Sequence, residues 1–257
     1  KQKIRSLNLT GINDAAAIAG DLLQPGELAI LVVPIDLGAP KGRLILPQVQ
    51  TLRDLLDHNV LALVVKENQL ADMLDKLAVK PALVITDSQV VNEAAAAVPP
   101  DIPLTTFSTL FARFKSKGQF RILLEGVKQI DQLEDGARIL IAEACTHHAM
   151  ADDIGRVKLP RWLAEYTGKG LKFEVAAGPA LKRDLRQYDM VIQCGGCMIT
   201  PTAYQNRLEE ANRAGVAISN YGLVISYIQG VLPRIISPYP ELRDLSLGFI
   251  QDRACRR

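Results

Sequence analysis

The six residues L-A-I-L-V-V at positions 28–33 form an unbroken apolar run, and this run decides the fold class. A strand that is half exposed alternates apolar and polar side chains, whereas a strand buried on both faces is apolar throughout. Strands of the second kind belong to parallel sheets that helices cover on both faces. We expect a second buried strand at residues 61–65, and further strands at residues 82–85, 138–142, 172–176, 190–193 and 216–219.

The segments between these runs carry helix signals. Pro47 can occupy the first turn of a helix, where a missing N–H costs nothing, and Thr200 before Pro201 is a good cap and first position. We expect helices at residues 47–57, 68–77, 87–97, 107–117, 121–133, 179–187, 200–214 and 220–231. Alternating strands and helices predict an α/β protein with mainly parallel sheets flanked by helices.

Three prolines, Pro99, Pro100 and Pro103, interrupt this rhythm, which restarts after Gly118. We therefore expect two small domains after an N-terminal linker. Their predicted bounds are 1–27 for the linker, 28–117 for the first domain and 118–257 for the second. The spaced prolines from Pro233 onward predict a tail that wraps the surface.

The composition excludes several classes of protein. With 48% hydrophobic and 23% charged residues, the chain can bury an ordinary core. A net charge of +2 is too balanced to favour nucleic acid or an anionic membrane as a partner. No apolar run reaches the ~20 residues of a membrane helix, and no signal peptide opens the chain. We expect a cytoplasmic protein.

Three of the four cysteines form a metal-ligand pattern. Cys145 lies in E-A-C-T-H-H at residues 143–148, and Cys194 and Cys197 lie in Q-C-G-G-C-M at residues 193–198. Cys145 and Cys194 each follow an expected strand, and parallel sheets bind ligands beyond the carboxyl ends of their strands. We therefore expect the three thiols to converge at one edge of a sheet.

The residues alone leave the kind of centre open. Three thiolates with His147 would make a closed tetrahedral zinc site. Three thiolates on a four-iron cluster would leave one iron for an exchangeable ligand, for which Glu143 and His147 are the candidates. His148 is more easily read as a solvated side chain. A third reading is an interaction module in which the cysteines are only buried structural residues.

Other catalytic signatures are missing from the sequence. Gly168-Lys169-Gly170 lacks the spacing of a phosphate-binding Walker loop, and no G-x-S-x-G elbow is present. Cys255, in R-A-C-R-R, is read as a surface thiol. We expect this chain not to be a catalyst.

The cysteine pattern resembles that of the HydF family, the FeFe-hydrogenase maturation GTPases. That family carries C-x-H, a gap of similar size, and then H-C-x-x-C. Here the gap between His147 and Gln193 is 45 residues, and Gln193 stands where many relatives have histidine. The likeness covers residues 28–117, which resemble the family's dimerisation domain, and residues 118–257, which resemble its cluster-binding domain.

The resemblance implies a 4Fe–4S cluster held by Cys145, Cys194 and Cys197, with water, Glu143 or His147 at the open position. It implies a homodimeric scaffold that receives a transient di-iron precursor from the radical-SAM maturases HydE and HydG. The scaffold would deliver that precursor to the FeFe-hydrogenase HydA. The family's GTPase domain lies upstream. GTP would therefore concern only a longer parent protein, which the first residue, Lys1, also leads us to expect.

Overall fold

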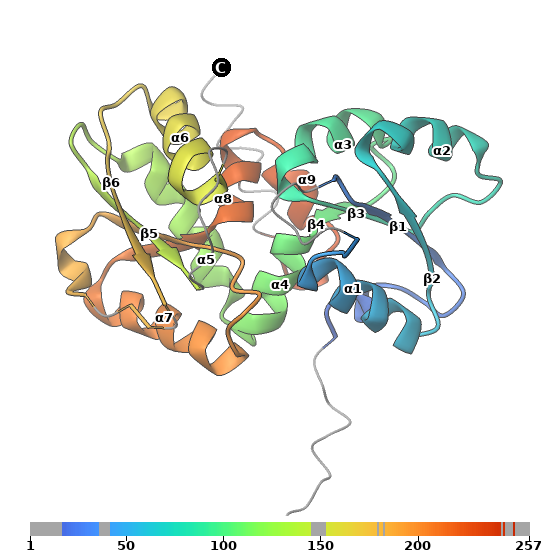
Figure 1. The fold of residues 1–257 in the computed structure, drawn as a ribbon, viewed down its shortest axis with the longest axis horizontal. Helices are drawn as coiled ribbons and strands as arrows, with labels where there is room; N and C mark the ends of the chain where they lie inside the picture. Colours follow the sequence, from blue (N-terminus) through green and yellow to red (C-terminus); the bar gives the residue numbers. More distant parts are fainter. Residues whose placement is uncertain are drawn as a thin grey trace, which may run out of the picture.

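The computed structural model describes residues 17–35, 42–144, 153–178, 180–181, 183–242, 244 and 249. These residues form two four-stranded parallel sheets with flanking helices, which confirms the predicted α/β class. Figure 1 shows the sheets at opposite ends of the molecule, with α4, α8 and α9 between them. The strands are β1 (Leu28–Val32), β2 (Leu61–Val65), β3 (Leu83–Thr86), β4 (Leu104–Thr106), β5 (Arg138–Glu143), β6 (Lys172–Ala177), β7 (Met190–Gln193) and β8 (Ala217–Asn220). The helices are α1 (Leu46–Asp57), α2 (Leu70–Lys76), α3 (Val91–Ala97), α4 (Phe107–Ser116), α5 (Phe120–Val127), α6 (Leu159–Thr167), α7 (Pro201–Ala214), α8 (Tyr221–Ile228) and α9 (Leu232–Ile236).

The structure confirms three predicted helix starts, one at a proline in the first turn and two at polar N-cap residues. Pro47 lies in the first turn of α1. The Thr200 side chain accepts the Ala203 N–H at 3.2 Å and so begins α7. Asn220 Oδ1 accepts the Leu223 N–H at 2.9 Å at the start of α8. Each cap satisfies a backbone donor that the first turn of a helix leaves without a partner.

The first sheet has the strand order β2-β1-β3-β4. Its central strand β1 is buried on both faces, as the apolar run predicts. The prediction that residues 61–65 form a strand buried on both faces is wrong in its second part. This segment is the edge strand β2, with Leu61 59% and Val64 42% exposed. The apolar composition of the segment predicted a strand, but it could not show that β2 lies at the edge of the sheet.

The second sheet has the order β6-β5-β7-β8. Strands β5 and β7 are parallel neighbours, and Ala142 pairs with Gln193 at their carboxyl ends. The two sequence segments that carry the predicted thiol ligands therefore leave the sheet side by side. This is the arrangement expected from the order of strands and loops.

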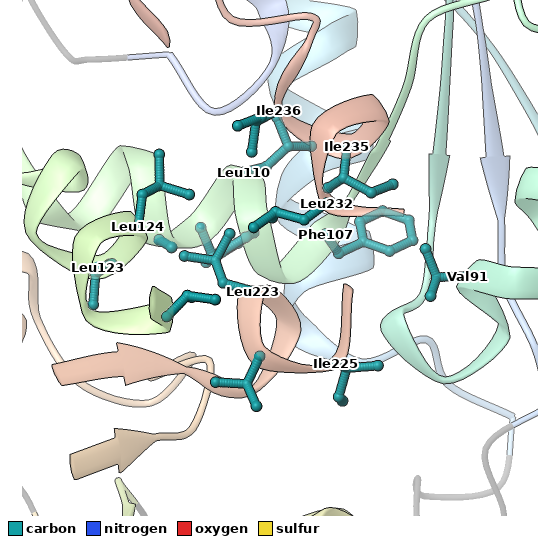
Figure 2. Close-up of a cluster of buried hydrophobic side chains, with 14 of the residues drawn as sticks. Val91, Phe107, Leu110, Leu123, Leu124, Leu223, Ile225, Leu232, Ile235 and Ile236 are labelled. Atoms are coloured by element: carbon teal, nitrogen blue, oxygen red, sulfur yellow. The ribbon is translucent and has the colours of Figure 1, made fainter. Parts of the chain in front are cut away.

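One apolar core joins the two sheets. Figure 2 shows side chains of α4, α5, α8 and α9 meeting in this region. The buried residues labelled there are Val91, Phe107, Leu110, Leu123, Leu124, Leu223, Ile225, Leu232, Ile235 and Ile236. Since the cluster draws on both halves of the chain, the two sheets stabilise each other through shared helices.

The tail predicted to wrap the surface is instead part of the core. Leu232, Ile235 and Ile236 of α9 are fully buried against the first sheet, next to β4. The hydroxyl of Tyr239 lies 2.6 Å from Thr105 Oγ1 in β4, and both side chains are buried. Pro233 does not prevent the helix, because it lies in the first turn.

Two local predictions also need correction. Within the described residues of 179–187, only a 3-10 turn forms, at Leu185–Gln187. The Asp184 carboxylate accepts the Arg186 N–H and favours a tight turn over a continuing helix. Asn68 does not cap a helix, since it lies inside a 3-10 turn, Glu67–Gln69, that precedes α2. No helix in the described ranges is long and apolar enough to cross a membrane.

Candidate metal centre

Two of the three predicted thiol ligands lie in the described structure. Cys194 and Cys197 are half-buried thiols in the loop between β7 and α7, and they are not joined in a disulfide. Cys145, His147 and His148 lie outside the described residues, as does Cys255. The arrangement of the predicted centre is therefore read from Cys194, Cys197 and the residues that surround them.

The end of β5 touches the Cys194 thiol. The backbone N–H of Ala144, the residue before Cys145, donates to Cys194 Sγ at 3.1 Å. The Cys194 N–H donates in turn to Ala142 O at 2.9 Å and continues the pairing of the two strands. A sulfur that accepts a backbone N–H is typical of thiolates that hold metals, because the bond stabilises negative charge on sulfur.

The loop geometry depends on one of its two glycines. Gly196 has φ +63°, and a Cβ there would lie 2.9 Å from Cδ2 of the buried Tyr204 ring. A Cβ on Gly195 would meet only Ser108 Oγ, at 3.8 Å. Gly196 is therefore required by backbone conformation and by packing, whereas Gly195 is not. The Ile199 N–H closes the turn on Gly196 O at 3.2 Å.

A buried lysine lies against this loop. The Lys115 ammonium, on α4, donates to the carbonyl oxygens of Gly196, Cys197 and Ile199, the last at 2.9 Å. Its side chain also lies over the Phe111 ring, with Nζ 5.5 Å from the centroid. Burial lowers the pKa of Lys115, while negative charge on the two cysteines acts in the opposite direction.

A second buried cation, Arg207 on α7, lies against the strand ends. Its guanidinium donates to Glu143 O at 2.9 Å, to Ala142 O at 3.4 Å and to Gly178 O. The residue is only 1% exposed. It therefore joins the carboxyl end of β5 to Gly178, which follows β6.

The carboxylate of Glu143, predicted as a candidate for the exchangeable position, is held by Arg156. Arg156 Nε and Nη2 donate to its two oxygens at 3.0 and 2.7 Å. Glu143 is 1% exposed, and this pairing raises the pKa of the Arg156 guanidinium. Glu143 could bind an iron only after leaving Arg156.

Buried polar groups surround Cys194 without complete hydrogen bonding. Among the described residues, neither the carboxamide of Gln193 nor the hydroxyl of Tyr204 makes a hydrogen bond of good geometry, although both residues are 0% exposed. The hydroxyl of Tyr221 is likewise buried and without a partner there. Burial and the nearby Cys194 raise the pKa values of both tyrosines, so the hydroxyls remain donors. Buried donors without well-formed hydrogen bonds beside a thiol fit a centre that presents sulfur acceptors.

Opposing effects act on the pKa of the Cys197 thiol. Burial raises the pKa of Cys197, and Cys194 adds to this shift, whereas the Lys115 cation opposes it. A metal displaces the thiol proton and so overcomes such a shift on binding. The described donors, two thiols with backbone and side-chain N–H groups around them, fit a thiolate-held metal centre. Within the described ranges, no three His, Cys, Asp or Glu side chains converge to complete one.

The sequence patterns of two known domains match this chain. The hydrogen maturase F dimerization domain matches residues 18–116, and the hydrogen maturase F tetramerization domain matches residues 121–238. The chain belongs to the hydrogen maturase F family. Both HydF domain names describe self-association, and the two matches divide the chain between α4 and α5.

Comparisons outside the family add little. No curated protein matches the chain. A solved structure described as the ABC domain in complex with L-Trp from Streptococcus pneumonia is 13% identical, covering 77% of this chain and 74% of that chain. Its TM-score is 0.28, which carries no argument about fold or function.

Sequence reasoning about this HydF chain missed the residues that support the thiols from other elements. Lys115 did leave a signal, because it follows Phe107 and Phe111 at intervals of four and so falls on the apolar stripe of its helix. A lysine on that stripe must find buried acceptors. Arg207 left no such signal, because nothing nearby in the sequence distinguishes it from a surface arginine of α7.

Proposed function

We propose that this chain is a scaffold that binds a 4Fe–4S cluster through Cys145, Cys194 and Cys197. In this role it receives a di-iron precursor and delivers it to an FeFe-hydrogenase in the cytoplasm. Its partners would be the maturases HydE and HydG and the hydrogenase HydA. When bound, a cluster with one iron free of thiolate supplies a bond that can form and break, as a carrier needs.

The observation that carries the proposal is the contact between Ala144 and Cys194. The 3.1 Å hydrogen bond from the Ala144 N–H to Cys194 Sγ puts the residue before Cys145 against the first thiol of C-G-G-C. Cys145 is the next residue in the sequence, and consecutive Cα atoms are about 3.8 Å apart. This supports a shared centre for the three cysteines over a role as unrelated buried residues.

The charges around the loop also support an anionic cofactor. Lys115 and Arg207 are both buried and direct their donors to backbone carbonyls of the loop and the strand end. A cluster held by thiolates carries negative charge, which would offset these buried cations. A zinc site with two or more thiolates would share part of this benefit, so zinc remains the competing reading.

Self-association is proposed to use the exposed edge of the first sheet. In the described residues β2 pairs only with β1, whereas the opposite edge strand, β4, is covered by α9. Apolar side chains around the β2 edge are exposed on both β2 and α1. They are Leu46, Val49, Leu56, Leu61 and Val64. An open edge strand with apolar neighbours favours pairing with a second copy.

The test is anaerobic reconstitution of the purified chain with iron and sulfide. We expect about four irons and four sulfides per chain, with an EPR signal after reduction that changes when imidazole is added. Cys145→Ala should keep the fold, measured by circular dichroism, but lose the cluster and the ability to activate the hydrogenase. Cys255→Ala is the matched control and should load fully.

Two results would contradict the proposal. Stoichiometric zinc that excludes iron, with loss of folding in Cys145→Ala, would instead support a structural zinc site. The absence of any stoichiometric metal, with partner binding intact after replacement of all three cysteines, would support an interaction module.

A further inference from the structure

Lys115 is a buried charge with an unusual set of partners. It is 4% exposed, and its ammonium is surrounded by the carbonyl oxygens of Gly196, Cys197 and Ile199. Among the described residues no carboxylate pairs with it. Two of these carbonyls lie inside the C-G-G-C loop, on Gly196 and on Cys197 itself.

An isolated buried ammonium is costly unless dipoles or an opposite charge stabilise it. Three carbonyls supply dipoles and use all three N–H donors of the ammonium. They supply no net negative charge, which leaves the thiol-bearing side of the loop as the place for an anion. The lysine and the metal-binding loop therefore form one electrostatic unit.

The lysine reaches this loop from the other half of the chain. Lys115 lies in the last turn of α4, inside the matched dimerization domain, while the loop lies inside the matched tetramerization domain. The backbone carbonyl of Lys115 accepts a hydrogen bond from Gln205 Nε2 on α7 at 3.1 Å. Both ends of this residue thus bond to the second domain.

We propose that Lys115 is a positioning residue of the metal centre, contributed by the dimerization domain to the C-G-G-C loop of the other domain. It holds the loop through three carbonyls and so fixes the backbone that carries both thiols. Its fixed positive charge stabilises the reduced, more negative cluster. The inference rests on the proposed function. Because Lys115 and the loop belong to different domains, the cluster site is complete only when both domains are folded together.

The experiment compares Lys115→Met with Lys117→Met in the whole chain. Lys115→Met keeps the length of the side chain but removes its charge and donors, whereas exposed Lys117 loses the same charge two residues away. The reconstituted cluster is titrated electrochemically, and iron release to a chelator is timed. The rate at which a thiol reagent modifies the metal-free protein reports on the loop without any cluster.

We expect Lys115→Met to shift the reduction potential to a more negative value, because a positive charge beside the cluster is lost. Iron release to the chelator should become about 10- to 100-fold faster, in line with the loss of metal affinity seen for other groups that orient metal ligands. Thiol modification should become faster. Lys117→Met should match the wild type in all three measurements, and Lys115→Arg should restore much of the potential because it keeps the charge.

The outcomes separate this inference from the proposed function. A wild-type chain that takes up no iron contradicts the scaffold function itself. A wild-type chain that loads, with Lys115→Met showing the same potential and iron release, overturns only the role of Lys115. If Lys115→Met does not fold, Lys115→Gln replaces it, and wild-type values in that variant overturn the inference equally.

Discussion

Arg156 donates two hydrogen bonds, at 3.0 and 2.7 Å, to the carboxylate of Glu143, which lies two residues before Cys145 in the sequence. Both carboxylate oxygens are used, and the acidic side chain is 1% exposed. The pairing removes from reach a carboxylate that the sequence made a candidate ligand for the open iron.

Glu143→Gln should therefore leave the cluster unchanged. We expect wild-type iron content and the same EPR response to imidazole, because the carboxylate belongs to Arg156. The free energy of unfolding should fall by about 1–3 kcal/mol. The loss of stability should stay below the ~3–5 kcal/mol expected for a fully buried pair, because Arg156 is 36% exposed and solvent can hydrate its guanidinium. A lost imidazole response would instead identify Glu143 as the exchangeable ligand, and His147→Ala tests the other candidate.

Cys194 should have two separable roles. Cys194→Ala and Cys194→Ser should both lose the cluster, as measured by iron and sulfide content. The serine oxygen can still accept the Ala144 N–H, whereas alanine leaves that donor without its acceptor. The alanine variant should therefore be about 1 kcal/mol less stable than the serine variant in urea unfolding. Full cluster content in either variant would contradict the proposed ligand set.

The two glycines of C-G-G-C provide a matched pair. Gly196→Ala should destabilise the protein by about 1–2 kcal/mol, because φ is +63° and the new Cβ meets Tyr204. Gly195→Ala should change stability and cluster retention little, since its Cβ finds only ordinary contact with Ser108. Urea unfolding and the rate of iron release measure both effects. Equal tolerance at the two positions would show that the loop does not depend on this turn.

The β2 edge should carry the dimer. Replacing Leu61 and Val64 together by lysine should lower the mass of the assembly measured by light scattering after size-exclusion chromatography, because charged side chains oppose edge pairing. Val79→Lys is the control, since Val79 is 64% exposed and lies outside β2 and α1. A double variant with the wild-type mass, or a wild-type protein that is monomeric at every concentration, would exclude this interface.

The buried hydroxyl of Tyr239 should contribute to the free energy of unfolding. Tyr239→Phe leaves Thr105 Oγ1 buried without its partner at 2.6 Å, which should cost about 1–2 kcal/mol in urea unfolding. Tyr166→Phe removes a hydroxyl that binds Asp131 at a 39% exposed position. That control should stay within about 0.5 kcal/mol of the wild type. A similar loss in both variants would argue against a special role for the buried pair.

Local sequence signals predicted most of the fold because most strands here are rich in apolar residues and several helices begin with polar caps. The segment L-T-T of β4 escaped prediction, since it is three residues long, follows Pro103 and contains two threonines. The burial of α9 escaped it for another reason. Whether Ile235 is buried depends on partners more than a hundred residues earlier in the chain, and no local pattern reports them.

The candidate site divides in the same way. The cysteine spacing is local, so Cys194 and Cys197 could be proposed as ligands from the sequence, and the structure puts the β5 end beside Cys194. Lys115 and Arg207 reach this region from separate helices, and their role depends on how α4 and α7 pack. Sequence spacing predicted which atoms could bind metal, but only the three-dimensional arrangement identifies the groups that support them.

The contact between Thr105 and Tyr239 has a consequence for how the protein is made. A ribosome releases the first sheet long before it releases Tyr239, which lies 134 residues later in the chain. During that interval, β4 and the inward face of α4 lack the cover that α9 provides in the finished molecule. Because Lys115 at the end of α4 also supports residues 196–199, the loop that carries Cys194 and Cys197 gains its full support only after translation has brought both halves together.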